Sequence, residues 1–283
     1  MSPTNGTTRA ARTHLPTRAL FWVAVTIVLV FFLFPPVWLV LTSLKTYKDA
    51  FAMPPVLFFR PTFASYLQIL TDGKFVWYAV HSTVVAFGST AISLLVGTPA
   101  AYALAKMRFR WSHDLSLFIL GSRIAPPIMT LFPLYLIFFH VHLLDNLLAL
   151  VITYVAVELS LVIWMLETFF EDVPDEIREA ALVDGTSEVG AFLRIMLPLV
   201  RSGLAATAIL SLIQAWNEFL FALVLTGSNS STLPVGITSF LTFQGTEWGP
   251  LTAAGTLVMI PMLIFGLLVQ KPLVRGMTLG AVK

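Results

Sequence analysis

Six long apolar stretches constrain this chain more than any other feature of its sequence. They are Leu20–Leu44, Phe75–Ala105, Leu115–Phe139, Leu147–Leu166, Leu204–Thr226 and Gly249–Gln270. Together they hold 146 of the 283 residues but only three of the 32 charged ones, Arg123, Glu158 and Glu218. Each is long enough to cross the hydrocarbon core of a bilayer, which takes about 20 apolar residues. The sequence therefore predicts an all-α, polytopic membrane protein with six transmembrane helices.

The distribution of Lys and Arg predicts the orientation of these helices. Twelve lie in the N-terminal tail, the loop after the second stretch, the segment 167–203 and the C-terminal tail, whereas only four lie in the other loops. Because an excess of basic residues marks the cytoplasmic side, both termini are expected in the cytoplasm. The loops 45–74 and 227–248 then lie outside it.

This orientation divides the chain into five regions. Residues 1–19 form a cytoplasmic tail, 20–44 the first transmembrane helix, 45–74 an extracytoplasmic loop, 75–270 a core of five helices, and 271–283 a second cytoplasmic tail. There is no cysteine, which excludes disulfides and thiolate chemistry. The net charge of +2 comes from the loops rather than a basic patch, so nucleic acid is not an expected partner. His140 and His142 would diverge on a helix, so no metal site is expected.

The segment 167–203 is the only long polar stretch on the predicted cytoplasmic side, and it holds eight of the fifteen acidic residues. Pro174 suits a first helical position, and Gly185 suits the left-handed position just past a helix end. We expect one helix over Pro174–Asp184 and a second over Ser187–Met196, with Pro198 opening the fifth span. Taken alone, this pattern also fits an interfacial helix pair packed on its own membrane domain.

A motif within this segment favours a more specific interpretation. Glu179-Ala180-Ala181 is followed by Asp184-Gly185, then Ile195, then Leu197-Pro198. This pattern resembles the signature loop of the membrane subunits of ATP-binding-cassette importers. Further segments are similar to the carbohydrate branch of that family, and above all to the second permease of maltose-type transporters: Pro133-Leu134-Tyr135, Trp216-Asn217-Glu218-Phe219, Pro261 and Gly276–Lys283.

The resemblance implies a sugar-importing permease subunit in the cell inner (plasma) membrane, surrounded by lipid. It implies three protein partners: a homologous second permease, a dimer of ATPase subunits and an extracytoplasmic sugar-binding protein. The signature loop would be the coupling helix that docks on the ATPase, where small alanines allow close contact and Glu179 meets a cation. Asp184, Gly185, Ile195, Leu197 and Pro198 complete this ATPase-coupling set.

The chain itself is expected to be a transport subunit rather than an enzyme. It contains no G-x-x-x-x-G-K-[ST] sequence, so ATP and Mg are expected on the partner ATPase, with no cofactor on this chain. A membrane-embedded enzyme would lack any nucleophile or metal constellation to work with. The alternative is a secondary transporter driven by an ion gradient, which would have no use for a coupling loop.

The three charges inside the apolar stretches each require an explanation, because a charge at the bilayer centre costs about 2.5–3.5 kcal/mol on insertion scales. Arg123 and Glu158 lie at equal depth in neighbouring antiparallel stretches, which predicts a structural ion pair. Glu218 continues a polar face with Thr207, Ser211 and Gln214. That face either holds helices together by hydrogen bonds or lines the sugar path, with Ser211, Gln214, Asn217 and Glu218 as path candidates.

Two further expectations concern the loop 227–248 and the C-terminal tail. The long outer loop 227–248 has no Lys or Arg and is either a passive solvated loop or a contact with the binding protein. By the resemblance, Asn229, Thr232, Gln244 and Trp248 are its contact candidates. After Pro272, which is expected to end the sixth helix, the tail Gly276–Lys283 is either frayed or lies against the ATPase, with turns at Gly276 and Gly280.

Overall fold

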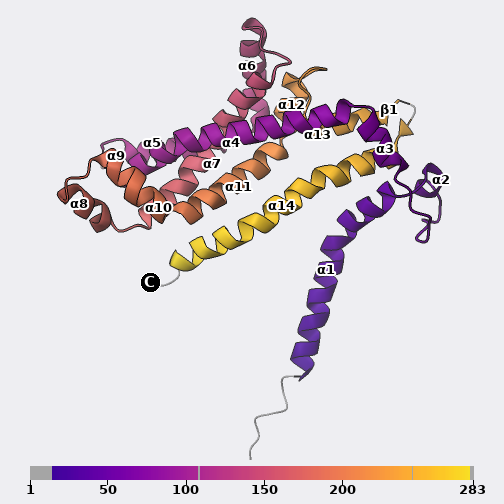
Figure 1. Cartoon of the computed structure of the whole chain (residues 1–283), viewed down its shortest axis with the longest axis horizontal. Coiled ribbons are helices and arrows are strands. Elements are labelled where there is room, and N and C mark those ends of the chain that lie inside the picture. Colours follow the sequence, from indigo (N-terminus) through magenta and orange to yellow (C-terminus); the bar gives the residue numbers. More distant parts are fainter. Residues whose placement is uncertain (1–14, 108, 244, 281–283) are drawn as a thin grey trace, which may run out of the picture.

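The structure is a computed structural model that describes residues 15–107, 109–243 and 245–280, and it is helical almost throughout. Four long helices run side by side along an elongated bundle, while a fifth, α1, leans away from it (Figure 1). The bundle helices are α4 (Lys74–Lys106), α7 (Leu147–Glu171), α11 (Arg201–Trp216) and α14 (Trp248–Gly280). Helix α1 (Leu15–Ser43) contacts the bundle through α14.

Short elements gather at the two ends of the bundle (Figure 1). One end carries α2 (Tyr47–Ala50), α3 (Ala64–Thr71), α13 (Leu233–Gly236), the 3-10 helix η2 (Ile237–Phe240) and a hairpin of β1 (Leu241–Thr242) and β2 (Gly245–Thr246), in antiparallel register with Leu241 opposite Thr246. The other end carries α8 (Asp175–Val183), α9 (Glu188–Ala191), the π-helix η1 (Phe192–Met196) and α10 (Leu197–Leu199). The end of α14 lies on the same side as α8 to α10 (Figure 1).

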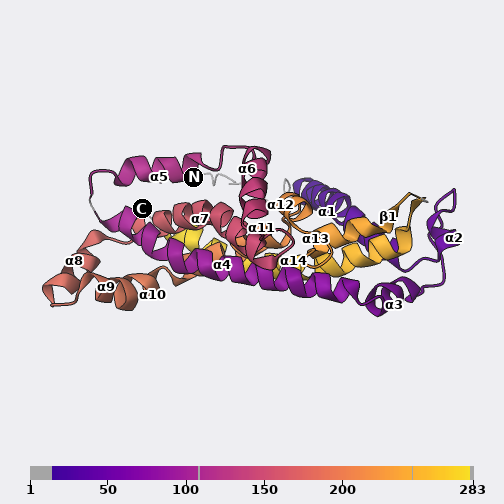
Figure 2. The same ribbon diagram turned by 90° about the horizontal axis from the view of Figure 1, so that it is seen from above.

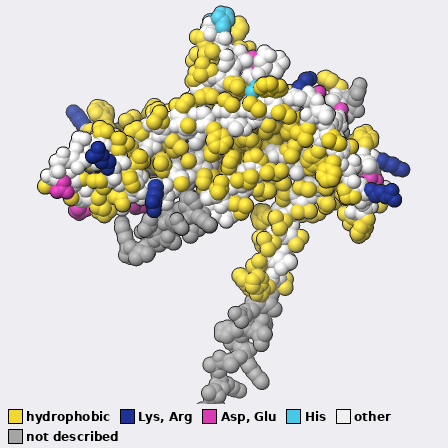
Figure 3. All heavy atoms as spheres, viewed as in Figure 1, with side chains coloured by type: hydrophobic (Ala, Val, Ile, Leu, Met, Phe, Trp, Pro, Cys, Tyr) yellow, Lys and Arg dark blue, Asp and Glu magenta, His cyan; other side chains and the backbone are white. Residues whose placement is uncertain are grey.

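The bundle has the dimensions and surface of a membrane domain. Within the described residues, four helices are long and apolar enough to cross a bilayer: α1, α4, α7 and α14. A fifth span results if the bent pair of residues 188–199 and 201–216 is counted as one, with a bend of 77°. The visible charges lie toward the two ends of the bundle and leave its middle apolar (Figure 3). The polytopic helical fold is confirmed, but the helices do not establish the count of six.

The third apolar stretch is not one helix. It is divided into α5 (Ser112–Gly121) and α6 (Pro127–His140), and α6 turns to stand across the direction of α4 (Figures 1 and 2). Pro126 and Pro127 explain the break, because proline disfavours helical geometry at the residue before it and lacks a backbone donor.

The fifth and sixth stretches also differ from expectation. The fifth ends as α11 at Trp216 and resumes as α12 (Leu220–Leu225) after a break at 217–219. The sixth continues as α14 through Pro272 to Gly280, so the expectation that Pro272 ends it was wrong. A proline removes one backbone hydrogen bond, and the helix continues here despite that loss.

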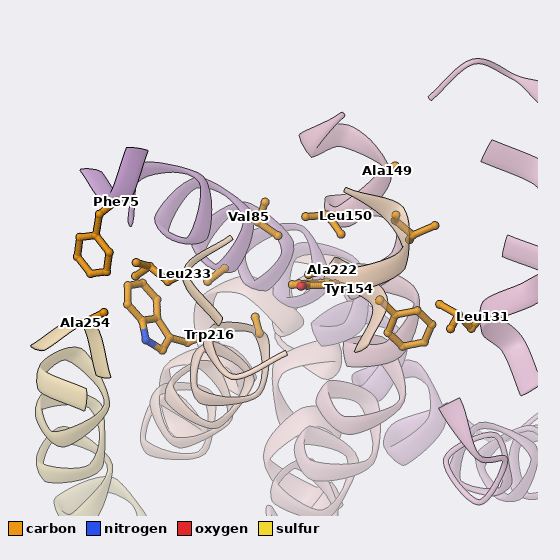
Figure 4. Close-up of a cluster of buried hydrophobic side chains, with 14 of the residues drawn as sticks. Phe75, Val85, Leu131, Ala149, Leu150, Tyr154, Trp216, Ala222, Leu233 and Ala254 are labelled. Atoms are coloured by element: carbon orange, nitrogen blue, oxygen red, sulfur yellow. The ribbon is translucent and has the colours of Figure 1, made fainter. Parts of the chain in front are cut away.

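The main core lies where the bundle helices and α12 meet, and its buried side chains include Leu150, Tyr154, Trp216 and Ala222 (Figure 4). The indole Nε1 of Trp216 donates to the carbonyl of Val258 on α14 at 3.3 Å. A second core joins α4, α7 and η1 nearer α8.

Helices α4 and α7 form the closest pair of the bundle. A Cβ at Gly97 would lie 2.6 Å from Val162, so only glycine permits this approach of the two helices.

Candidate functional sites

The signature segment forms a pair of short helices joined by a tight turn. Helix α8 begins after Pro174 and ends at Val183, within one residue of the predicted bounds at each end. Gly185 has a φ of +85°, and its N–H and that of Thr186 donate to the carbonyls of Leu182 and Ala181, both at 3.0 Å. These two bonds close the helix end, as expected for a left-handed glycine.

The second helix of the pair, α9, begins at a side-chain cap. The Ser187 side chain accepts a hydrogen bond from the Gly190 N–H, which starts α9, and the helix continues as the π-helix η1 to Met196. Pro198 does not open the fifth span as predicted. It lies in α10, which continues from η1, and the bundle helix begins only after Val200, at Arg201.

The signature residues do not all face outward. Glu179, Ala180 and Asp184 are exposed, as is Pro198, while Ile195 and Leu197 are half-buried. Ala181 is only 5% exposed because it packs inside this chain. The expectation that both alanines face another surface was therefore wrong for Ala181.

Polar contacts from two residues fix this helix pair to the C-terminal end of α4. The buried Lys106 donates from Nζ to Val173 O at 2.6 Å and to Asp175 Oδ1 at 2.7 Å. Glu188 accepts from Arg178 on α8 and, at 3.2 Å, from the Tyr102 hydroxyl on α4. The hydrogen bond from Arg178 holds the pKa of Glu188 below its ordinary value, so this contact stays charged at neutral pH.

Neither contact could be predicted from the sequence. Lys106 and Asp175 lie 69 residues apart, and Tyr102 and Glu188 lie 86 apart, so no local spacing links them.

The predicted ion pair between Arg123 and Glu158 is not formed. Glu158 is 1% exposed and accepts from Ser89 Oγ at 3.0 Å, between α4 and α7. Arg123 lies in the turn between α5 and α6 and is exposed. The prediction assumed a straight third helix, and the break before Pro126 moves Arg123 out of register with α7.

Glu218 lies beyond the end of α11 and caps α12. Its carboxylate accepts from the backbone N–H groups of Phe221 at 2.9 Å and Ala222 at 3.1 Å. It also accepts from the Tyr154 hydroxyl at 2.8 Å. These bonds satisfy donors that a helix start leaves open, which explains a charge placed at a mid-stretch helix break.

The other members of the predicted polar face differ in exposure. Thr207 and Ser211 are fully buried, and Thr207 Oγ1 donates to Gly203 O. Asn217 is exposed and donates to Ile213 O at 2.9 Å. Among the four path candidates, Gln214 lines a cavity.

That cavity has a volume of about 580 Å³ and lies between α6, α7 and α11. Most of its lining is apolar, and its polar members include Arg123, Thr130, Ser160 and Gln214. Sequence reasoning missed Thr130 and Ser160, because single hydroxyls in apolar helices also bond to their own backbone, as Ser160 does to Val157.

The outer loop is held by one carboxylate. Asp145, between α6 and α7, accepts from the backbone N–H groups of Gly227, Asn229 and Ser230 and from the Asn229 and Ser230 side chains, at 2.7–3.3 Å. Burial raises the pKa of Asp145, but the hydrogen bonds from Ser230, Gly227 and Asn229 outweigh it, and the pKa lies below its ordinary value. The loop is therefore anchored rather than freely solvated at its start.

The predicted binding-protein contacts in this loop differ in their exposure to solvent. Asn229 is exposed but its amide is bound to Asp145. Thr232 is 3% exposed, so it is not available to a partner, because α13 folds back onto α4. Trp248 is 43% exposed, and Gln244 lies outside the described residues. The fully exposed Phe243 at the hairpin tip was not predicted.

Comparison with known proteins identifies similar chains. Residues 93–279 match the family described as "Binding-protein-dependent transport system inner membrane component". The chain is 41% identical to the probable ABC transporter permease protein y4oR of Sinorhizobium fredii, over 97% of this chain and 99% of that one. It is 33% identical to the sulfoquinovosyl glycerol transport system permease protein SmoH of Agrobacterium fabrum, over 94% of each chain.

Two further matches extend this comparison. The chain is 32% identical to the trehalose/maltose transport system permease protein MalG of Thermococcus litoralis, over 94% of this chain and 97% of that one. Among solved structures, it resembles a chain of a bacterial ABC transporter that imports the acidic polysaccharide alginate. That match has a TM-score of 0.77 and 21% identity, and covers 94% of this chain and 99% of that one.

Proposed function

The chain belongs to the family of binding-protein-dependent transport system inner membrane components, and from this premise we propose how it works as a sugar importer's permease. Like its relatives it is an ABC transporter permease, a transport subunit whose ATPase is a separate chain. Relatives named for sulfoquinovosyl glycerol, diacetylchitobiose and trehalose support a sugar as its substrate. Membership of this family excludes the alternative of an ion-driven secondary transporter.

The single observation that carries the proposed mechanism is the exposed face of α8. Glu179, Ala180 and Asp184 are presented to solvent on a helix whose first residue is held by Lys106 of α4. Its Arg178 also binds Glu188, which accepts from Tyr102 of α4. We propose that this face docks on the partner ATPase, which holds ATP and Mg. Closure of the ATPase dimer would then move α8 and switch the bundle between inward and outward access.

The experiment that tests this mechanism is uptake in membrane vesicles with the catalytic glutamate of the ATPase subunit replaced by glutamine. Uptake should be lost, while the complex is still recovered intact. Uptake that persists would contradict the mechanism. Screening the cognate binding protein against sugars would then name the substrate.

The proposed topology places both termini and α8 to α10 in the cytoplasm, with α2, α3 and the hairpin outside. The sixth crossing would be made by α5 and α6 together, bent at Arg123–Pro126. The chain has no cysteine, so single cysteines introduced at exposed positions report this topology. A cysteine at Val183 should react with a membrane-impermeant maleimide only after the cell is opened, and one at Phe243 in intact spheroplasts.

The cavity lined by Gln214 and Ser160 is proposed to face the homologous second permease and to form part of the sugar path. Hydroxyl and amide groups form hydrogen bonds with the hydroxyl groups of a sugar, and the remaining lining is apolar. The end of the outer loop, with Phe243 at the hairpin tip and Trp248 at the start of α14, is proposed to contact the docked binding protein. Shortening the hairpin should remove stimulation of ATP hydrolysis by the binding protein, and unchanged stimulation would contradict this role.

The tail Gly276–Lys283 is proposed to contact the ATPase dimer, at the end of the bundle where α14 finishes. Deleting these eight residues should lower coupled ATP hydrolysis without removing the protein from the membrane. Wild-type transport by the truncated permease would show that the tail has no such role.

A further inference from the structure

Helix α4 is tied through its own side chains to both functional ends of the bundle. It is 33 residues long and continuous in spite of Pro99, and it runs along the bundle from the side of α8 to α10 to the side of α3 (Figure 1). At about 1.5 Å per residue its length is about 50 Å, more than the thickness of a bilayer core.

At its cytoplasmic end α4 holds the coupling helix through side chains one turn apart. Tyr102 and Lys106 lie four residues apart and so on one face of the helix. Lys106 donates hydrogen bonds to Val173, just before α8, and to Asp175, its first residue. Tyr102 donates to Glu188, which also accepts from Arg178 of α8. The start of α8 and the start of α9 are thereby linked to the last two turns of α4, and Arg178 joins α8 to the same Glu188.

At its other end α4 holds the outer loop in the same manner. The Ser82 hydroxyl accepts from the Leu233 backbone N–H at 2.8 Å in a buried contact. One residue before it, His81 Nδ1 lies 3.0 Å from Ser231 O. One turn earlier, the ring of Tyr78 lies against Gly236, where a Cβ would come within 2.2 Å of it.

We propose that α4 is a rigid rod that carries movement between the coupling helix α8 and the outer loop, so that both move with it as one body. The proposal rests on the proposed function, because it assumes that α8 meets the ATPase and that the outer loop meets the binding protein. It adds that docking on one side of the membrane is transmitted to the other along this helix, by Lys106 and Glu188 at one end and Ser82 at the other. These are positioning residues, since they act through α8 and the outer loop.

The test measures distances by electron–electron double resonance in the assembled complex. Because the chain has no cysteine, spin labels can be placed at two chosen pairs: Leu95→Cys with Glu176→Cys, and Leu95→Cys with Ser239→Cys. All three positions are exposed. The first pair joins α4 to α8 and the second joins α4 to η2, and each is measured before and after trapping with Mg-ATP and orthovanadate.

In the otherwise unmodified chain, the most populated distance of each label pair should be the same before and after trapping. With Lys106→Met the most populated α4–α8 distance should shift on trapping, and with Ser82→Ala the most populated α4–η2 distance should shift. Thr83→Ala is the matched control, because Thr83 is exposed and bonds only to its own helix at Ala79. It should leave both distances unchanged.

Several results would overturn the proposal. A shift in either distance in the unmodified chain would show that α4 does not move with its partners, and this measurement needs no variant to fold. Distances that stay fixed in Lys106→Met and Ser82→Ala would show that these side chains do not make the connection. Failure of vanadate to retain nucleotide on the complex would instead count against the proposed function itself.

Discussion

The Tyr154 hydroxyl on α7 donates a 2.8 Å hydrogen bond to the Glu218 carboxylate, which lies between the two halves of the fifth apolar stretch. The same carboxylate accepts from two backbone N–H groups of α12. Glu218, a charged residue inside an apolar stretch, thus stabilises the break between α11 and α12 inside the bundle.

Replacing Glu218 by Leu should lower the stability of the assembled complex, because two backbone donors and one hydroxyl lose their acceptor. The expected cost is about 1–3 kcal/mol, the range for a buried polar group left unsatisfied. Thermal unfolding followed by tryptophan fluorescence measures it. Tyr154→Phe, which leaves the two backbone bonds, should cost less, and equal midpoints for Glu218→Leu and wild type would contradict the capping role.

Gly185→Ala should destabilise the turn after α8. A non-glycine residue in the left-handed region costs about 1–2 kcal/mol, and Gly185 has a φ of +85° with open space around it, so the cost is conformational and not steric. The measurement is the stimulation of ATP hydrolysis by the binding protein, which should fall. Gly121→Ala is the control, since Gly121 ends α5 with nothing near its added Cβ. An equal effect of both changes would argue against a special role for the turn.

Asp145→Asn should loosen the outer loop in a pH-dependent way. The folded-state pKa of Asp145 lies below its ordinary value of 3.8, so its carboxylate contributes stability above that pH and loses it as pH falls through the folded-state pKa. Wild type and variant should therefore differ in unfolding midpoint at pH 7 and converge below pH 3.8. A constant difference across this range would show that the charge is not what anchors the loop.

Gln214→Leu and Ser160→Ala should each reduce sugar uptake several-fold while the complex is still recovered. Both side chains line the cavity between α6, α7 and α11. Thr168→Ala is matched to Ser160→Ala, because Thr168 is on the same helix and also bonds to its own backbone, but lies outside the cavity lining. Uptake that responds equally to Ser160→Ala and Thr168→Ala would remove the cavity from the path.

The sequence predicted those features that depend on local chemistry. The bounds of α8, the left-handed Gly185 and the apolar helices follow from spacing, caps and hydropathy. Predictions from the sequence failed where contacts between distant elements determine the structure. The pairing of Arg123 with Glu158 assumed a straight helix through Pro126, and the polar face from Thr207 to Glu218 assumed a continuous α11.

Buried contacts between separate helices had no signal in the sequence at all. Ala181 was expected on an open face because alanine fits both an interface and a core. Thr232 was expected to contact the binding protein, because nothing nearby in the sequence shows that α13 folds onto α4. Lys106 and Asp145 could not be selected, because their partners lie 69 and more than 80 residues away.

Lys45, just beyond α1, is 4% exposed, and its ammonium lies 4.6 Å from the centre of the Trp38 ring and 5.4 Å from that of Phe59. Such a cation is held by the negative faces of the two rings. It is consequently shielded from reagents that modify amines, whereas its neighbour Lys48 is exposed. Acylation would mark Lys48 and spare Lys45, so chemical footprinting of these two lysines reports directly on whether the contact between α1 and the segment 45–63 is closed.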